Sequence, residues 1–133
     1  MPPLLRALRP GQWTKNLFVL APILFGKAAG DPERLTATLL TFACFCAIAS
    51  ALYLVNDVAD READALHPVK SRRPIASGAL SVNTALATSV VLLAAAMTAL
   101  ALRAPSALPY AAAYAVVVAL YTRTPAGVEV LVR

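Results

Sequence analysis

Long uncharged apolar stretches alternate with short polar segments along the chain, and this pattern predicts membrane-spanning helices. Two uncharged windows are well defined, at residues 35–55 and 82–102, and a third follows at 104–122. A helix over residues 35–55 would be about 31 Å long, which matches the roughly 30 Å hydrocarbon layer of a bilayer. Pro105 and Pro109 are expected to shift the helical start of this third window towards Tyr110, and we place the span at about 108–122.

The first apolar stretch is less regular, because Pro22 interrupts the short uncharged run between Lys15 and Lys27. We place a span at 13–29 with a kink at Pro22, anchored by Trp13 at one interface and by Lys27 at the other. A secretory signal peptide is the alternative for this segment. The further spans that follow favour the membrane-spanning interpretation.

Together these segments predict an all-α fold, a polytopic transmembrane bundle of about four helices in which two hairpins are joined by the polar loop 56–81. Lys and Arg crowd the cytoplasmic side of membrane proteins. If the N-terminus is inside, nine of these residues lie inside and three outside: Arg6, Arg9, Lys15, Arg61, Lys70, Arg72, Arg73, Arg123 and Arg133 against Lys27, Arg34 and Arg103. We therefore predict a multi-pass protein of the cell (plasma or inner) membrane, with its N-terminus and loop 56–81 in the cytoplasm.

Composition agrees with this fold class, since 59% of the 133 residues are hydrophobic and only 14% are charged. The net charge of +5 is explained by topology and by anionic lipid or phosphate ligands. No basic face is interleaved with aromatic residues, so a nucleic-acid partner is not expected. Cys44 and Cys46 lie two apart in one apolar helix and point in different directions, which argues against a disulfide or a metal site there.

A cluster of carboxylates, NDVADREAD, follows the second span directly. If that helix continues beyond the membrane, Asp57, Asp60 and Asp64 share one face at i, i+3 and i+7, whereas Glu62 points away. Like charges at this spacing destabilise a helix unless a cation compensates, and Mg²⁺ prefers hard oxygen ligands. The stripe therefore predicts a magnesium site supported by the amide of Asn56. The alternative is a solvated extension of the helix that merely marks the membrane interface.

Basic residues then follow in the segment HPVKSRRPIASG, after Pro68 ends the helix. Lys70, Arg72 and Arg73 are predicted to bind phosphate oxygens, and Lys15 at the start of the first span is a further candidate. The positive-inside rule explains these cations but not the aspartates. Cations and carboxylates that converge beside lipid indicate a magnesium diphosphate whose partner substrate is a lipid.

These residues resemble the first aspartate-rich motif and the downstream loop of the UbiA-type intramembrane prenyltransferase superfamily. Its pattern N-D-x-x-D-x-x-x-D is matched by Asn56, Asp57, Asp60 and Asp64. The N-terminal LRPGQWTKN also resembles the R-P-x-Q-W-x-K-N stretch of one branch, the decaprenyl-phosphate phosphoribosyltransferases. It is matched by Arg9, Pro10, Gln12, Trp13, Lys15 and Asn16.

The resemblance implies a helical membrane bundle around a cavity that opens to the cytoplasm and to the lipid. In the phosphoribosyl branch, Mg²⁺ at the aspartates would orient 5-phosphoribosyl diphosphate for attack by a polyprenyl phosphate such as decaprenyl phosphate, in the synthesis of cell-wall arabinan precursors. In the aromatic branch, the same aspartates would hold a polyprenyl diphosphate for transfer to an aromatic acceptor of a quinone or haem pathway. A small four-helix membrane transporter or a non-catalytic membrane subunit is the alternative outside enzymes. Membrane lipids are expected partners, and the sequence leaves the oligomeric state open, homo-oligomers included.

The chain departs from the superfamily pattern in one respect. A second aspartate-rich motif is expected in the other half of the bundle, yet Glu129 is the only acidic residue after Asp64. The resemblance covers nearly the whole chain but only about the first half of a family member. We therefore interpret the chain as a fragment or a prematurely ended reading frame, and expect the activity of the complete chain only.

Overall fold

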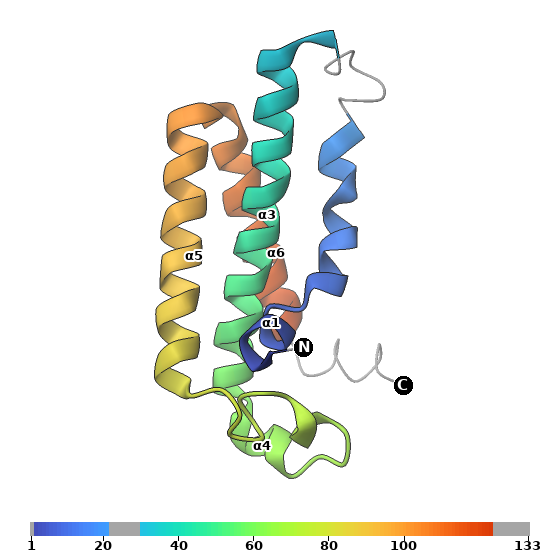
Figure 1. Cartoon of the computed structure of the whole chain (residues 1–133), viewed down its shortest axis with the longest axis vertical. Helices are drawn as coiled ribbons and strands as arrows, with labels where there is room; N and C mark the ends of the chain where they lie inside the picture. Colours follow the sequence, from blue (N-terminus) through green and yellow to red (C-terminus); the bar gives the residue numbers. More distant parts are fainter. Residues whose placement is uncertain (1, 22–29, 124–133) are drawn as a thin grey trace.

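A computed structural model describes residues 2–21 and 30–123, and every regular element in this part is helical (Figure 1). The short elements are α1 (Pro3–Leu8), α4 (Arg61–Ala65), η3 (Lys70–Arg72) and η4 (Pro105–Ala107). The long ones are the 3-10 helix η1 (Pro10–Leu20) and the α-helices α3 (Pro32–Ala59), α5 (Val82–Arg103) and α6 (Leu108–Arg123). The prediction of an all-α helix bundle is confirmed.

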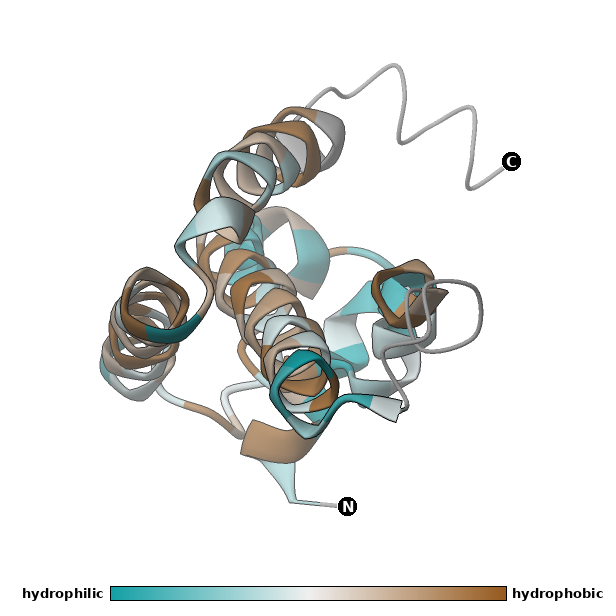
Figure 2. Ribbon diagram, turned by 90° about the horizontal axis from the view of Figure 1, so that it is seen from above, coloured by the Kyte–Doolittle hydropathy of each residue, from teal (hydrophilic) through white to brown (hydrophobic). Residues whose placement is uncertain are grey.

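The central element is α3, which packs against α1, η1, α5 and α6. Seen from above, the other long elements surround it (Figure 2). The side of α5 that is buried carries small residues, Ala85, Ser89 and Ala96, which let the two helix backbones approach closely. The central position of α3 allows its polar residues to meet partners from every other long element.

The ends of the helices follow from local chemistry. Asp31 caps α3 by accepting hydrogen bonds from the backbone N–H groups of Glu33 and Arg34, and Ser81 caps α5 by accepting from the N–H of Thr84. Pro109 lies in the first turn of α6, where a missing N–H removes no helical hydrogen bond. The helix can therefore begin at Leu108, before the proline, rather than at Tyr110.

Two of these helices, α3 and α5, are long and apolar enough to cross a membrane, and α6 belongs to a shorter apolar helical stretch. With 28 residues, α3 is about 42 Å long and extends past both ends of the predicted span 35–55. Large apolar side chains are exposed along α5 and α6, including Val90, Val91, Val116 and Val117. This is the surface expected of a bundle surrounded by lipid, while the four-span topology and its orientation stay predictions.

The N-terminal segment differs from the expectation in detail. A helix begins at Pro10, three residues before the predicted start, and it has 3-10 rather than α geometry. Arg9 joins it to α1 in the left-handed backbone conformation, with φ 53°. Residues 22–29, with the predicted kink at Pro22 and the second half of the span 13–29, lie outside the described part of the chain.

Candidate functional site

One end of the bundle gathers the N-terminal segment, the end of α3, the connection from α4 to η3, and the last part of α6 (Figure 1). Between them lies a pocket of about 450 Å³. It is lined by Arg9, Gln12, Lys15, Asn16, Tyr53, Asn56, Asp60, Lys70, Arg73, Tyr114, Val117 and Val118. Four separate segments of the chain therefore contribute to one cavity.

Most of the charged side chains that line this pocket are cationic. It holds four cationic side chains, those of Arg9, Lys15, Lys70 and Arg73, and one acidic side chain, that of Asp60. Arginine offers forked donors to phosphate oxygens and lysine a compact charge. The pocket thus has the charge and the donors to bind a phosphorylated anion.

The aspartate stripe does not lie on one uninterrupted helix. The helix α3 ends at Ala59, and α4 begins at Arg61 after Asp60 adopts φ −96° and ψ 4°. Asp60 lines the pocket, whereas Asp57 and Asp64 are buried beside it, with only 3% and 5% of their surface exposed. The break therefore separates the middle carboxylate from the outer two, which we had expected on a single face.

Asp57 and Asp64 are joined by arginines in one ion-pair network. Nη2 of Arg9 lies 2.6 Å from Oδ1 of Asp57, and Nη1 of Arg73 lies 3.5 Å from the same oxygen. Nη1 of Arg73 also lies 3.1 Å from Oδ2 of Asp64. Each buried carboxylate thus faces a cation, which such burial requires.

The N-terminal segment is held against α3 by a ladder of polar contacts. Arg9 pairs with Asp57 and stacks over the ring of Tyr53, with its guanidinium carbon 4.7 Å from the ring centre. One turn further, Nε1 of Trp13 donates to Oγ of Ser50 at 2.9 Å. The indole predicted as an interfacial anchor is therefore also tied into the bundle.

The ladder ends on a fully buried asparagine between three helices. Nδ2 of Asn16 donates to Sγ of Cys46 at 3.6 Å, and the hydroxyl of Tyr114 on α6 donates to Oδ1 of Asn16 at 2.7 Å. Phe45 stacks on the ring of Tyr114, with centroids 5.0 Å apart. Because Lys15 precedes this fixed residue, the contacts also fix the backbone that presents Lys15 to the pocket.

The loop that carries the basic residues has its own support. Nδ1 of His67 accepts hydrogen bonds from the backbone N–H groups of Val69 and Lys70, each at 3.1 Å. Gly78 takes φ +84°, which favours glycine, in the turn that leads to α5. His67 therefore shapes the turn that places Lys70 at the pocket.

The motif residues at this end of the bundle supply carboxylate and amide oxygens, the atoms that a divalent cation such as Mg²⁺ binds. The described residues contain no group of three or more His, Cys, Asp or Glu side chains arranged to hold a metal ion. However, Oδ1 of Asn56 is buried and accepts no hydrogen bond from the described part of the chain, and Asn56 lines the pocket together with Asp60. Amide and carboxylate oxygens fit Mg²⁺, which commonly uses one or two carboxylates and completes its shell with water and substrate phosphates.

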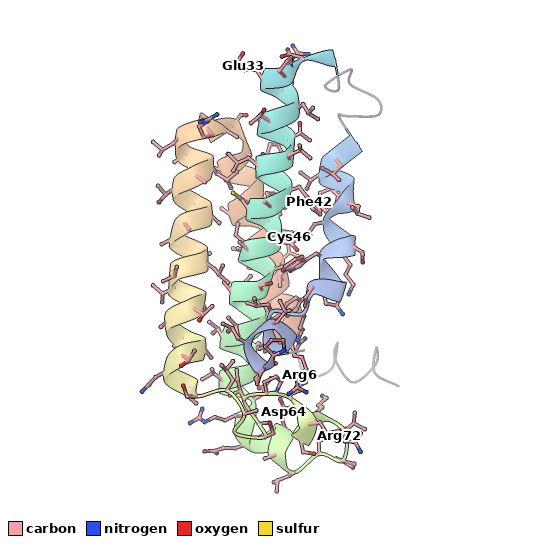
Figure 3. All side chains as sticks on the ribbon, viewed as in Figure 1. Arg6, Glu33, Phe42, Cys46, Asp64 and Arg72 are labelled. Atoms are coloured by element: carbon pink, nitrogen blue, oxygen red, sulfur yellow. The ribbon has the colours of Figure 1, made fainter. Side chains whose placement is uncertain are left out.

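The predicted site residues are thus distributed in three ways. Five line the pocket: Lys15, Asn56, Asp60, Lys70 and Arg73. Asp57 and Asp64 do not line it but pair with its arginines. Arg72, on the loop below the helices (Figure 3), is exposed and does not line the pocket. Their roles in binding stay predictions.

Sequence reasoning missed five polar lining residues: Arg9, Gln12, Asn16, Tyr53 and Tyr114. The signal for the first three was present, since all three belong to the R-P-x-Q-W-x-K-N stretch. Tyr53 could have been found from its place one helical turn before Asp57. Nothing in the sequence pattern marked Tyr114, which reaches the pocket through the packing of α6.

Comparison with known proteins agrees with this geometry. Residues 17–129 match the UbiA prenyltransferase family, and the chain belongs to this family. Members of the family are integral membrane proteins, and its enzymes generally depend on a divalent metal.

The chain is similar to the decaprenyl-phosphate phosphoribosyltransferases of Corynebacterium glutamicum and Mycobacterium tuberculosis. It is 47% identical to the first over 93 residues, which are 68% of this chain and 28% of that protein. It is 45% identical to the second over 91 residues, or 65% of this chain and 30% of that protein. The 4-hydroxybenzoate octaprenyltransferase of Polaromonas naphthalenivorans is 36% identical over 89 residues, or 67% of this chain and 30% of that protein.

The chain thus matches less than a third of the length of these relatives. All three are named as transferases of the two branches that the sequence had suggested. Family membership therefore favours the enzyme over the transporter or the membrane subunit.

Proposed function

We propose that this chain forms the donor-binding end of a membrane transferase, which moves a phosphoribosyl group from 5-phosphoribosyl diphosphate to a polyprenyl phosphate such as decaprenyl phosphate. The observation that carries the proposal is the pocket in which four cations meet Asn56 and Asp60 beside an apolar helix surface. The two phosphoribosyltransferase relatives, at 45–47% identity, support this substrate pair over the octaprenyl branch at 36%. The reaction would supply a precursor of cell-wall arabinan.

The chemistry follows from the charges of the pocket. Lys15, Lys70 and Arg73 would bind the diphosphate of the donor and stabilise the charge that develops on it as it leaves. The phosphate oxygen of the polyprenyl phosphate would form a bond to the anomeric carbon of the ribose, while the bond from that carbon to the diphosphate breaks. Pyrophosphate is released, and the lipid-facing surface keeps water from the oxocarbenium-like centre.

A divalent cation, which we propose to be Mg²⁺, would neutralise charge on the diphosphate when bound. Asn56 and Asp60, whose oxygens line the pocket, would be the first protein ligands of this cation. Asp57 and Asp64 complete the proposed metal set once their arginines are displaced. We further propose that this end of the bundle faces the cytoplasm, where the water-soluble donor is found.

Donor binding is tested on this chain and transfer on the complete transferase that contains it, both in non-ionic detergent with Mg²⁺. Titration with 5-phosphoribosyl diphosphate is expected to show saturable binding. Radiolabelled donor and decaprenyl phosphate are expected to yield a labelled lipid that extracts into organic solvent. Binding without transfer would retain the pocket assignment and reject the transfer, whereas absence of binding rejects both.

A second candidate is prenyl transfer to an aromatic ring, for which the octaprenyltransferase relative is the supporting observation. Replacing the substrates by a polyprenyl diphosphate and 4-hydroxybenzoate tests it in the same preparation. A prenylated product, formed when no phosphoribosyl lipid is formed, would favour this branch.

A further inference from the structure

The two arginines that line the pocket hold the two buried aspartates of the motif. Arg9 and Arg73 both approach the same atom, Oδ1 of Asp57, and Arg73 also contacts Asp64. The aspartate side chains are 3% and 6% exposed, whereas those of Arg9 and Arg73 are 26% and 31% exposed. The carboxylates are therefore enclosed, and the guanidinium groups lie between them and the cavity.

This arrangement makes the predicted ligands compete with resident charges. A divalent cation that approaches Oδ1 of Asp57 meets two guanidinium groups already close to that oxygen, and the like charges repel. A phosphate anion that approaches Arg9 must likewise compete with the Asp57 carboxylate for the same donors. A phosphate alone would leave the buried Asp57 carboxylate with fewer cationic partners, which is costly in a poorly solvated site, and a cation alone would leave the half-buried guanidinium groups without theirs.

We propose that Arg9 and Arg73 are exchangeable counter-ions of the motif aspartates. When cation and diphosphate enter together, the guanidinium groups move from the carboxylates to the diphosphate oxygens, and the carboxylates become free to bind the cation. Before binding, the same arginines keep the aspartates neutralised. This inference rests on the proposed function, and it assigns Arg9 a role in ligand exchange that the motif pattern alone does not give.

The first test measures the affinity of the protein for Mg²⁺ alone, by calorimetry in non-ionic detergent without any phosphate. Arg9→Gln and Arg73→Gln remove the competing charge, so each is expected to bind Mg²⁺ about tenfold more tightly than the wild type. Arg72→Gln is the matched control, because it removes the same charge from the neighbouring, exposed position, and its affinity is expected to stay within about twofold. If the wild type, Arg9→Gln and Arg73→Gln bind Mg²⁺ with equal affinity, the proposal is wrong.

The second test changes the aspartate instead of the arginines and measures anion binding. It still decides the question if an arginine variant fails to fold. Asp57→Asn preserves the shape of the side chain but releases Arg9 from its charged partner. In the presence of EDTA it is expected to bind inorganic pyrophosphate about tenfold more tightly than the wild type. Glu62→Gln, which removes an exposed acid from α4, is expected to change this affinity less than about twofold. Unchanged pyrophosphate binding by Asp57→Asn would contradict the exchange.

The proposed function and the exchange can fail separately. If the wild type binds no pyrophosphate even with Mg²⁺ present, the donor pocket is wrong and the exchange is wrong with it. If the wild type binds both ligands together but neither kind of variant gains affinity for the single ligand, the donor pocket stands and only the exchange is rejected.

Discussion

The two ends of the bundle carry similar residue types but use them differently. At the loop end, Arg9 lies 2.6 Å from Asp57, whose side chain is 3% exposed. At the opposite end, Arg34 lies 3.5 Å from Asp31, and these side chains are 71% and 47% exposed. A hollow of about 500 Å³ is present there too, and its lining includes Arg34 and Arg103. Neither the residue types nor the size of the hollow distinguishes the two ends.

Burial and connectivity make the difference. Within residues 2–21 and 30–120, the buried charged side chains are Asp57 and Asp64, both at the loop end. Asp31 has a local role as the cap of α3, within three residues of its partner. Arg9 and Asp57, in contrast, are 48 residues apart and join two segments of the chain. Desolvated pairs between distant segments distinguish the loop end as the candidate site, whereas the solvated local pair lies at the start of a helix.

The largest difference between the ends is expected in stability. Arg9→Gln leaves the buried carboxylate of Asp57 with Arg73 alone, at 3.5 Å. Loss of one partner from a buried pair should lower the free energy of unfolding by about 3 kcal/mol. Unfolding in mixed micelles by increasing amounts of a denaturing detergent measures this loss. A change below about 1 kcal/mol would show that the network is solvated like the opposite end.

The next largest difference between the two ends is expected in their contribution to donor binding. Lys70 lines the pocket and takes no part in the arginine–aspartate pairs, so Lys70→Ala removes a phosphate contact and leaves the network in place. The Kd for 5-phosphoribosyl diphosphate is expected to rise about tenfold, or about 1.4 kcal/mol. Arg103→Ala in the other hollow is the control, with an expected change below about twofold. Equal losses in both variants would mean that general positive charge, and not this pocket, binds the donor.

A smaller effect is expected from two tyrosines of α6. Tyr114→Phe keeps the ring that stacks on Phe45 but removes the hydroxyl that donates to the buried Asn16. The unsatisfied amide oxygen should lower the free energy of unfolding by about 1 kcal/mol. Tyr110→Phe, in the first turn and 74% exposed, should change it by less than about 0.3 kcal/mol. The same unfolding measurement compares the two variants. A difference near zero would show that the hydrogen bond from Tyr114 to Asn16 does not stabilise the bundle.

Much of the fold could be predicted from the hydrophobic pattern. Uncharged windows long enough for a bilayer coincide with α3 and α5, and α6 begins at Leu108, two residues before the start towards which the prolines pointed. The 3-10 geometry of η1 was not predicted, and neither were the contacts of Trp13 and Asn16 with α3. Such contacts join residues far apart in sequence, and periodicity carries no information about them.

The residue types of the candidate site could be read from the sequence, but the contacts between them could not. The spacing of the motif identified the aspartates, and the following basic segment identified Lys70 and Arg73. The pairing of Asp57 with Arg9 could not be derived, because it requires the N-terminal segment to run beside α3. The break at Asp60 was also missed, since helix periodicity assumes that the backbone continues without a change in direction.

The smallest loss of stability is expected at the Asp31–Arg34 end of the bundle. Its size decides whether burial is what distinguishes the two ends. Arg34→Gln removes the charge from the Asp31 pair, but Asp31 still accepts the backbone N–H groups that cap α3. Exposed pairs of this kind contribute little because water screens both charges, so the free energy of unfolding should fall by less than about 0.5 kcal/mol. Added salt should shrink even this change, whereas the loss in Arg9→Gln should persist because its partner is enclosed. If Arg34→Gln were as destabilising as Arg9→Gln in the same micelles, ion pairing itself, irrespective of burial, would account for the stability of both ends.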